Sequence, residues 1–297
     1  MDGLYEAAAR WAQSGAIPAV FAHAFMVRGL VAALLLGPLF GGMGTLVVSK
    51  RLSFFVQAIA NASITGTAIG LLLGEPRGAT YAGLYGFCLA SALLVSYLRN
   101  RSRATNDTVT GVFLAQTLGL GVIMLSLVSK RFDIHQVEAT LFGSLLTLRD
   151  EDLAFLAATA LLAAAVGGGL YNAFLVSSVN PALARVRGLS PVLLDYVFIA
   201  LATVVVVGGL KFVGALLILV MIVVPAAAAQ NVAANLRQFF WTSLGLSTLS
   251  AVGGLAVSAV WPVPTGGAIA LVSSALFGVT AAVRPFLGHS LPAREMG

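Results

Sequence analysis

Polar side chains with regular spacing interrupt one of the long apolar stretches of this sequence, Phe54 to Leu73. They recur every four positions: Ser53, Gln57, Asn61 and Thr65. On a helix this spacing places them on one slowly turning stripe. Their hydroxyl and amide groups can hydrogen-bond a polar solute or supply neutral oxygen ligands to a hard cation. They can equally bond to neighbouring helices, so a pathway lining and interhelical contacts are both consistent with the residues.

Residues with stronger chemistry are scarce. The single cysteine, Cys88, lies in an apolar run and cannot form an internal disulfide. The three histidines, His23, His135 and His289, share no metal-ligand spacing, and no zinc-protease or nucleophile-elbow motif is present. The sequence also lacks the glycine-rich loop with lysine that cradles nucleotide phosphates. We therefore expect neither an enzyme nor a cofactor bound by this chain, and any ATP and magnesium must be held by another subunit.

The composition indicates how these side chains are positioned. The chain has 297 residues, of which 59% are hydrophobic and only 9% are charged, and its mean hydropathy is +0.97. So few charges cannot cover a water-facing surface. We predict an all-α polytopic integral membrane protein, a single transmembrane domain over residues 1–297 that meets the lipid bilayer. The net charge of +6 is then a topology signal and does not indicate nucleic-acid binding.

Nine apolar stretches are long enough to cross the hydrocarbon layer, which takes about 20 helical residues. They run from Gly29 to Val48, Phe54 to Leu73, Ala79 to Leu98, Val109 to Val128, Leu153 to Leu175, Leu193 to Gly209, Phe212 to Ala229, Phe239 to Trp261 and Gly267 to Val283. Only Gly208 to Lys211 separates the sixth from the seventh, so a single broken helix, and a total of eight spans, also fits the pattern.

The charges divide between alternate loops. One set of loops carries ten cations: Lys50, Arg51, Arg99, Arg101, Arg103, Arg185, Arg187, Arg237, Arg284 and Arg294. The other set mixes five cations with six acidic residues: Arg77, Lys130, Arg131, Arg149, Lys211, Glu75, Asp133, Glu138, Asp150, Glu151 and Asp152. Cytoplasmic loops retain Lys and Arg during insertion. We therefore predict that the first set is cytoplasmic, which places the N-terminus outside and the C-terminus inside.

Two short segments and two glycine pairs add detail to this arrangement. Residues 1–15 have the pattern of an amphipathic helix that lies in the membrane interface. Residues 177–192 form a cytoplasmic loop with a short helix of its own, which Asn180 caps, Pro181 begins and Gly188 ends. Gly37 with Gly41, and Gly66 with Gly70, have the GxxxG spacing that lets helices approach closely. The short helix in residues 177–192 is basic and lies beside the membrane. We therefore interpret it as a docking element for a cytoplasmic partner and not as an ordinary interfacial turn.

Six fragments in order along the chain resemble the membrane permeases of bacterial ABC importers for zinc, manganese and related divalent metals. They are GTLVVSKRLSFFVQAIANASITGTAIG (Gly44 to Gly70), NDTVTGV (Asn106 to Val112), LFGSLLTLRDEDL (Leu141 to Leu153), NPALARVRGL (Asn180 to Leu189), LKFVGALLILVMIVVPAAAA (Leu210 to Ala229) and VPTGGAI (Val263 to Ile269). The resemblance implies a permease of the bacterial inner membrane that imports a divalent metal by alternating access. It also implies a dimer of permeases, two cytoplasmic ATPase subunits and an extracytoplasmic solute-binding protein.

Further residue roles follow from the resemblance. The family's coupling helix, which contacts the ATPase, corresponds here to Asn180, Pro181, Leu183, Ala184, Arg185 and Gly188. The family's pathway carries Asp and His in a pattern like DAISHA, where this chain has Gln57 and Asn61 in QAIANA. Both positions line the path in the family and hold the metal in transit. Two neutral amides supply no negative charge and are poor ligands for zinc.

Three explanations fit this departure from the family pattern. The amides form a weak site through which a metal still passes, the cargo is a chelated metal or a small polar solute, or the dimer partner is a different permease with acidic ligands. Metal uptake by a homodimer is the prediction, because the other fragments keep the family pattern. An ATP-independent carrier or channel is the rival class, and a scaffold is a third. The carrier hypothesis is disfavoured because the centres of the spans hold no ionisable residue that could couple transport to an ion gradient.

Overall fold

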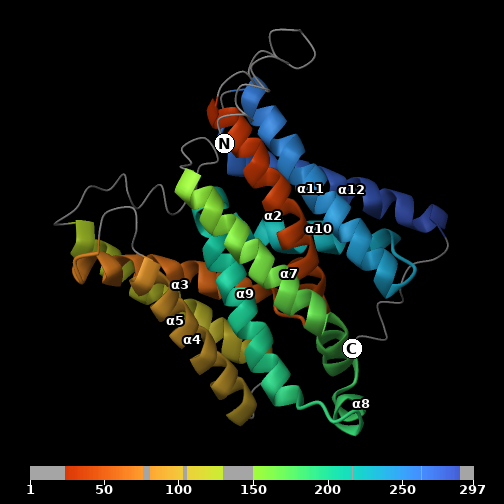
Figure 1. The fold of residues 1–297 in the computed structure, drawn as a ribbon, viewed down its shortest axis with the longest axis horizontal. Helices are drawn as coiled ribbons and strands as arrows, with labels where there is room; N and C mark the ends of the chain where they lie inside the picture. The colour runs from red at the N-terminus through yellow and green to blue at the C-terminus, as the bar shows by residue number, and fades with distance from the viewer. Residues whose placement is uncertain are drawn as a thin grey trace.

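The fold was obtained as a computed structural model, which describes residues 24–75, 81–102, 106–129, 150–215, 217–261 and 263–287. Across these ranges every regular element is a helix (Figure 1). The helices are α2 (Ala24–Ser49), α3 (Ser53–Leu72), α4 (Tyr81–Arg101), α5 (Asn106–Ser129), α7 (Asp150–Val179), α8 (Pro181–Val186), α9 (Pro191–Val213), α10 (Ile218–Val232), α11 (Leu236–Val260) and α12 (Thr265–Leu287). The predicted all-α architecture is confirmed.

Each of the nine predicted apolar stretches coincides with one of the helices other than α8. Among the described residues, seven of these helices are long and apolar enough to cross a membrane. The other two, α5 and α10, contribute shorter apolar segments, Thr108–Met124 and Ile218–Val232. The membrane-protein class is therefore established while the count of nine spans stays a prediction. The predicted helix over residues 1–15 lies outside the described residues.

The boundary between the sixth and seventh stretches was predicted wrongly. The α9 helix continues through Gly208 and Gly209 and ends only at Val213. Gly214 then takes a φ of 86°, in the left-handed region where glycine carries no steric penalty, and its N–H donates to the Leu210 carbonyl. The chain then leaves in a new direction as the separate helix α10, which begins at Ile218 (Figure 1).

The helices form two groups with α7 and α9 between them (Figure 1). One group contains α3, α4 and α5, in which α3 packs against both of the others. The second contains α2, α10, α11 and α12. The α9 helix packs against α3 and α4, whereas α7 packs against α2 and α9, so the central pair joins the groups. Beyond them α8 lies at the end of the α7–α9 hairpin, which we call the α8 end of the bundle.

Both predicted glycine pairs lie at close helix crossings. A Cβ at Gly41 would lie 2.8 Å from the Leu244 Cα, which shows how closely α2 approaches α11. The α3–α4 crossing is similarly tight, because a Cβ at Gly83 would lie 2.6 Å from the Gly70 Cα. Helices in lipid gain no hydrophobic driving force from pairing, so dispersion contacts at such crossings hold them together. The expectation of tight packing at these glycines is confirmed.

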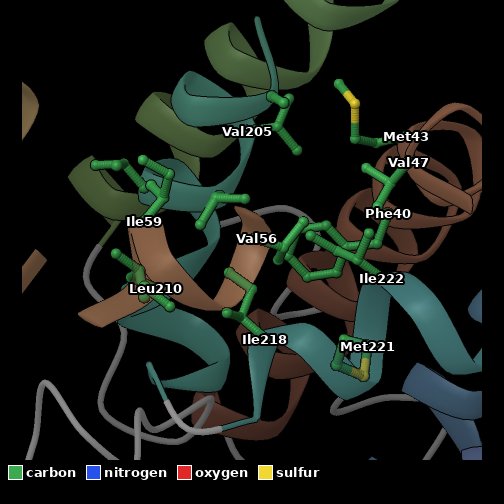
Figure 2. Close-up of a cluster of buried hydrophobic side chains, with 14 of the residues drawn as sticks. Phe40, Met43, Val47, Val56, Ile59, Val205, Leu210, Ile218, Met221 and Ile222 are labelled. Carbon is green, nitrogen blue, oxygen red and sulfur yellow. The ribbon is translucent and has the colours of Figure 1, made fainter. Parts of the chain in front are cut away.

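A buried apolar cluster lies where α2, α3, α9 and α10 meet (Figure 2). Side chains from all four helices contribute to it, among them Phe40, Val56, Ile59, Val205 and Ile222. Successive helical residues are rotated by about 100°. Because Val56 and Ile59 face this cluster, Gln57 and Asn61 lie on a different side of α3.

Candidate functional site

Two of the four stripe residues contact each other. The Gln57 Nε2 group donates a hydrogen bond of 3.1 Å to the Asn61 Oδ1 atom, one helical turn further along α3. Asn61 is 7% exposed and Gln57 is half-buried. In this arrangement Gln57 Oε1 is not used by the bond, nor are the amide hydrogens of Asn61. The pair, which we call the amide pair, can therefore both accept further hydrogen bonds, chiefly at the Gln57 Oε1 atom, and donate others to a ligand beside α3.

The other two stripe residues lie apart from this contact. Ser53 is half-buried at the first residue of α3. Thr65 is only 1% exposed and faces α5, where a Cβ added at Gly121 would lie 3.6 Å from its Oγ1 atom. Among the described residues, nothing hydrogen-bonds this Oγ1. The predicted stripe therefore extends from a partly exposed end at Ser53 to an end enclosed by a neighbouring helix at Thr65.

The amide pair itself carries no charge. Within the described ranges no group of three or more His, Cys, Asp or Glu side chains is placed to hold a metal ion. The three histidines of the sequence lie outside those ranges. Amide oxygens suit hard cations, and a hydrated cation can also be held through its water molecules. The amide pair can therefore bind a cation only weakly, through neutral oxygen atoms or through the water molecules of the hydrated ion.

The short helix at the α8 end has a strongly defined local structure. Asn180 caps it by accepting a 3.0 Å hydrogen bond from the Leu183 N–H, and Pro181 occupies the first turn. After its last turn Gly188 adopts a φ of 74°. The Gly188 N–H then donates to the Arg185 carbonyl at 2.9 Å, and the Leu189 N–H donates to the Ala184 carbonyl at 3.0 Å. These two bonds are those of a Schellman motif, so the predicted start and stop of this helix are both confirmed.

The side chains of α8 point mostly outward. Ala184 is fully buried, whereas Pro181, Leu183 and Arg185 are exposed. Val186 is 85% exposed and was not among the predicted contact residues, although its place in the same short helix was a usable signal. A projecting helix with apolar and cationic side chains is suited to insertion into a groove on a partner.

A partly buried ion pair near this helix was missed from the sequence. The Lys50 Nζ atom lies 2.6 Å from the Asp195 Oδ1 atom, with side-chain exposures of 6% and 35%. The same ammonium group lies 5.3 Å from the centre of the Phe198 ring, within the range of a cation–π contact. From the sequence, Lys50 served only as a marker of a cytoplasmic loop. The two partners are 145 positions apart, so no local pattern indicated their contact.

Comparison with known families matches residues 22–284 to the model of the ABC 3 transport family. This chain belongs to the ABC 3 transport family. It is thus a multi-pass membrane permease, as the resemblance of its six fragments implied. Its helical fold and its apolar helices agree with that assignment.

Several relatives of this ABC 3 family chain match over most of their length. The manganese transport system membrane protein MntC of Listeria innocua is 28% identical over 266 residues, covering 90% of this chain and 93% of that protein. The high-affinity zinc uptake system membrane protein ZnuB of Haemophilus influenzae is 26% identical, covering 85% and 93%. A solved structure, PsaBC from Streptococcus pneumoniae in complex with Fab, is 24% identical with a TM-score of 0.78, covering 90% and 94%. That similarity shows the fold.

Proposed function

We propose that this chain is the permease subunit of an ATP-driven importer that moves a divalent metal ion, zinc or manganese, across the bacterial inner membrane. The observation that carries the proposal is the family match over residues 22–284. Relatives matched at similar length are named for manganese transport and for zinc uptake. The working unit is a homodimer of this chain with two cytoplasmic ATPase subunits and an extracytoplasmic solute-binding protein. Its N-terminus lies outside and its C-terminus in the cytoplasm.

The energy for transport comes from the partner ATPase, which holds ATP and magnesium, and reaches this chain at α8. The exposed Leu183, Arg185 and Val186 enter a groove on the ATPase, while Asn180 and Gly188 fix the helix that carries them. Residues 177–192 are thus the coupling loop. When the ATPases close, the loop moves and the helices shift between outward-facing and inward-facing arrangements.

The metal passes beside α3, where the amide pair contacts it. Without a carboxylate, the path has no negative charge at this level to hold a dehydrated ion. A weak site still serves conduction, because an ion must leave as readily as it arrives. Ser53 contributes a hydroxyl at the α8 end of the path, and Thr65 closes the stripe at the other end.

The neutral chemistry of the amide pair also supports a second cargo. A chelated metal or a small polar organic solute needs hydrogen-bond donors and acceptors and no compensating charge, and Gln57 and Asn61 supply both. A different cargo would leave the architecture and the ATPase partnership unchanged. A heterodimer with a permease that keeps acidic ligands is the third arrangement to test.

The test is uptake into vesicles that contain the purified permease and ATPase, with the binding protein supplied outside. We expect radioactive manganese or zinc to accumulate only when ATP is present inside. The double variant Gln57→Ala with Asn61→Ala should lose at least ten-fold in uptake while the complex still assembles. Ser63→Ala is the matched control, because the Ser63 hydroxyl donates within α3 to the Ala60 carbonyl.

A gain-of-function variant distinguishes the possible cargoes. Gln57→Asp with Asn61→His adds a carboxylate and an imidazole, and we expect metal affinity to rise at least ten-fold, which corresponds to about 1.4 kcal/mol. An unchanged affinity would mean that these side chains do not face the ion. Uptake by the permease alone, without any ATPase, would instead establish the ATP-independent carrier.

A further inference from the structure

Lys50 lies at the junction of two helices that have different roles in the proposed importer. It follows α2 directly and precedes α3, the helix that carries the amide pair. Its side chain reaches Asp195 in α9 and lies over the Phe198 ring. Since α9 begins only a few residues after α8, the ion pair connects the coupling loop to the start of the pathway helix.

In the described part of the chain, α8 itself packs mainly against the two helices that flank it, α7 and α9. Its Schellman motif joins it tightly to the segment before α9, where the Ser190 hydroxyl accepts a hydrogen bond from the Leu193 N–H. A displacement of α8 is therefore passed to the first turns of α9, which include Asp195.

The connection between α2 and α3 is stiff enough to pass such a displacement on. The Arg51 N–H donates to the Val48 carbonyl and the Leu52 N–H donates to the Val47 carbonyl, at 3.1 and 2.9 Å. Arg51 has a φ of 55°, a conformation that few non-glycine residues adopt, and Leu52 is buried. Because this turn is closed by hydrogen bonds and anchored by Leu52, a pull on Lys50 moves the start of α3.

Burying the Lys50 ammonium group is an expensive way to hold helices together, even though Asp195 keeps 35% of its side chain exposed. Well-packed apolar side chains often stabilise a fold as well or better, because burying charges carries a desolvation penalty. What an ion pair adds is a directional contact between two specified points. The α3–α9 packing at the cluster of Figure 2 is apolar, and apolar contacts specify no such pair of points.

We propose that Lys50 is a positioning residue that couples movement of the α8–α9 unit to the pathway helix α3 through its ion pair with Asp195. The proposal rests on the proposed function and adds the route by which ATP hydrolysis reaches the path. Without the ion pair the ATPase stays docked and active, but movement of α9 no longer displaces the start of α3. The consequence is hydrolysis with little transport.

The experiment measures metal transported per ATP hydrolysed in vesicles containing the full complex with its binding protein. The main variant is Lys50→Gln with Asp195→Asn, which removes the pair without leaving an unpaired buried charge. We expect hydrolysis within about two-fold of wild type and at least a ten-fold lower transport ratio. The exchange variant Lys50→Asp with Asp195→Lys should recover part of that ratio, and Lys50→Arg most of it. Arg101→Gln, a cation next to Tyr97 near the end of α4, is the matched control.

Each result decides the matter. A neutral double variant with the wild-type ratio overturns the coupling role. So does a double variant that fails to assemble, since the pair would then be a structural requirement. A wild-type complex that hydrolyses ATP and moves no metal overturns the proposed function itself, and the coupling role falls with it.

Discussion

The double variant Asn180→Ala with Gly188→Ala removes the residues that cap the two ends of α8 and leaves the exposed side chains of the helix unchanged. Asn180 accepts the hydrogen bond from the Leu183 N–H that caps the start of the helix. Gly188 closes its end with a φ of 74°, and a Cβ added there would meet nothing within 4 Å. The change therefore weakens the helix through its caps alone and creates no clash.

The size of the effect follows from the lost hydrogen bond of Asn180 and from the backbone conformation at position 188. Losing a side-chain cap costs about 1 kcal/mol. Placing alanine in the left-handed region costs about 1–2 kcal/mol more. The helix has only six residues, a length that is marginal without tertiary support. The two losses together come to about 2–3 kcal/mol. If docking to the ATPase requires α8 to be folded, its affinity falls with the folded fraction, by up to about 30-fold for a loss of about 2 kcal/mol and about 150-fold for a loss of about 3 kcal/mol.

The assay is the affinity of the purified permease for its ATPase, measured in detergent or nanodiscs. Gly74→Ala is the matched control: Gly74 has a φ of 83° and equally open surroundings, but it follows the other end of α3. We expect the control to lose similar backbone stability and to keep its affinity. Equal affinities for the wild type and the double variant would refute docking through α8.

Two further predictions concern the crossing of α2 and α11. Gly41→Ala should lower the melting temperature of the purified protein by an amount equivalent to about 1–3 kcal/mol, because its new Cβ would lie 2.8 Å from the Ser243 carbonyl oxygen. Gly245→Ala, which meets nothing within 4 Å, is the control and should melt like the wild type. Ser243→Ala should cost only about 0.6 kcal/mol, since it removes one buried 2.8 Å hydrogen bond to the Gly41 carbonyl. A larger loss from Ser243→Ala than from Gly41→Ala, in the same thermal assay, would contradict the importance of backbone approach at this crossing.

Features that depend on neighbouring residues were predicted well from the sequence. The apolar stretches predicted the positions of the helices, because a membrane span needs about 20 consecutive, mainly apolar residues. The bounds of α8 followed from three residues, Asn180, Pro181 and Gly188, whose capping preferences act within one turn. The helix break was misplaced because Gly208 and Gly209 resemble a stop signal. In the structure Gly208 instead gives room to Thr159 of α7, close to where a Cβ would lie.

Features that depend on distant residues were beyond sequence reasoning. The four-residue spacing placed Gln57 and Asn61 on one side of a helix, where the structure shows them in contact, yet it could not show that α5 encloses Thr65. The pairing of Lys50 with Asp195 could not be predicted either, because the charge of a residue does not reveal which helix lies opposite it. In a chain where tight packing depends on small residues, many helix pairings have similar patterns, and tertiary contacts select among them.

The two ends of α3 are held by different kinds of contact, and this difference determines how it can move. At the end away from α8, the Gly70 backbone lies against Gly83 of α4, and the Glu75 Oε1 atom accepts a 2.8 Å hydrogen bond from the Gly83 N–H. Such close backbone contact resists sliding, so this crossing should act as a fixed point between α3 and α4. At the α8 end, the start of α3 is linked to α9 through the side chain of Lys50. A shift of α9 would therefore tilt α3 about its crossing with α4 and displace the amide pair, which lies between the two attachments.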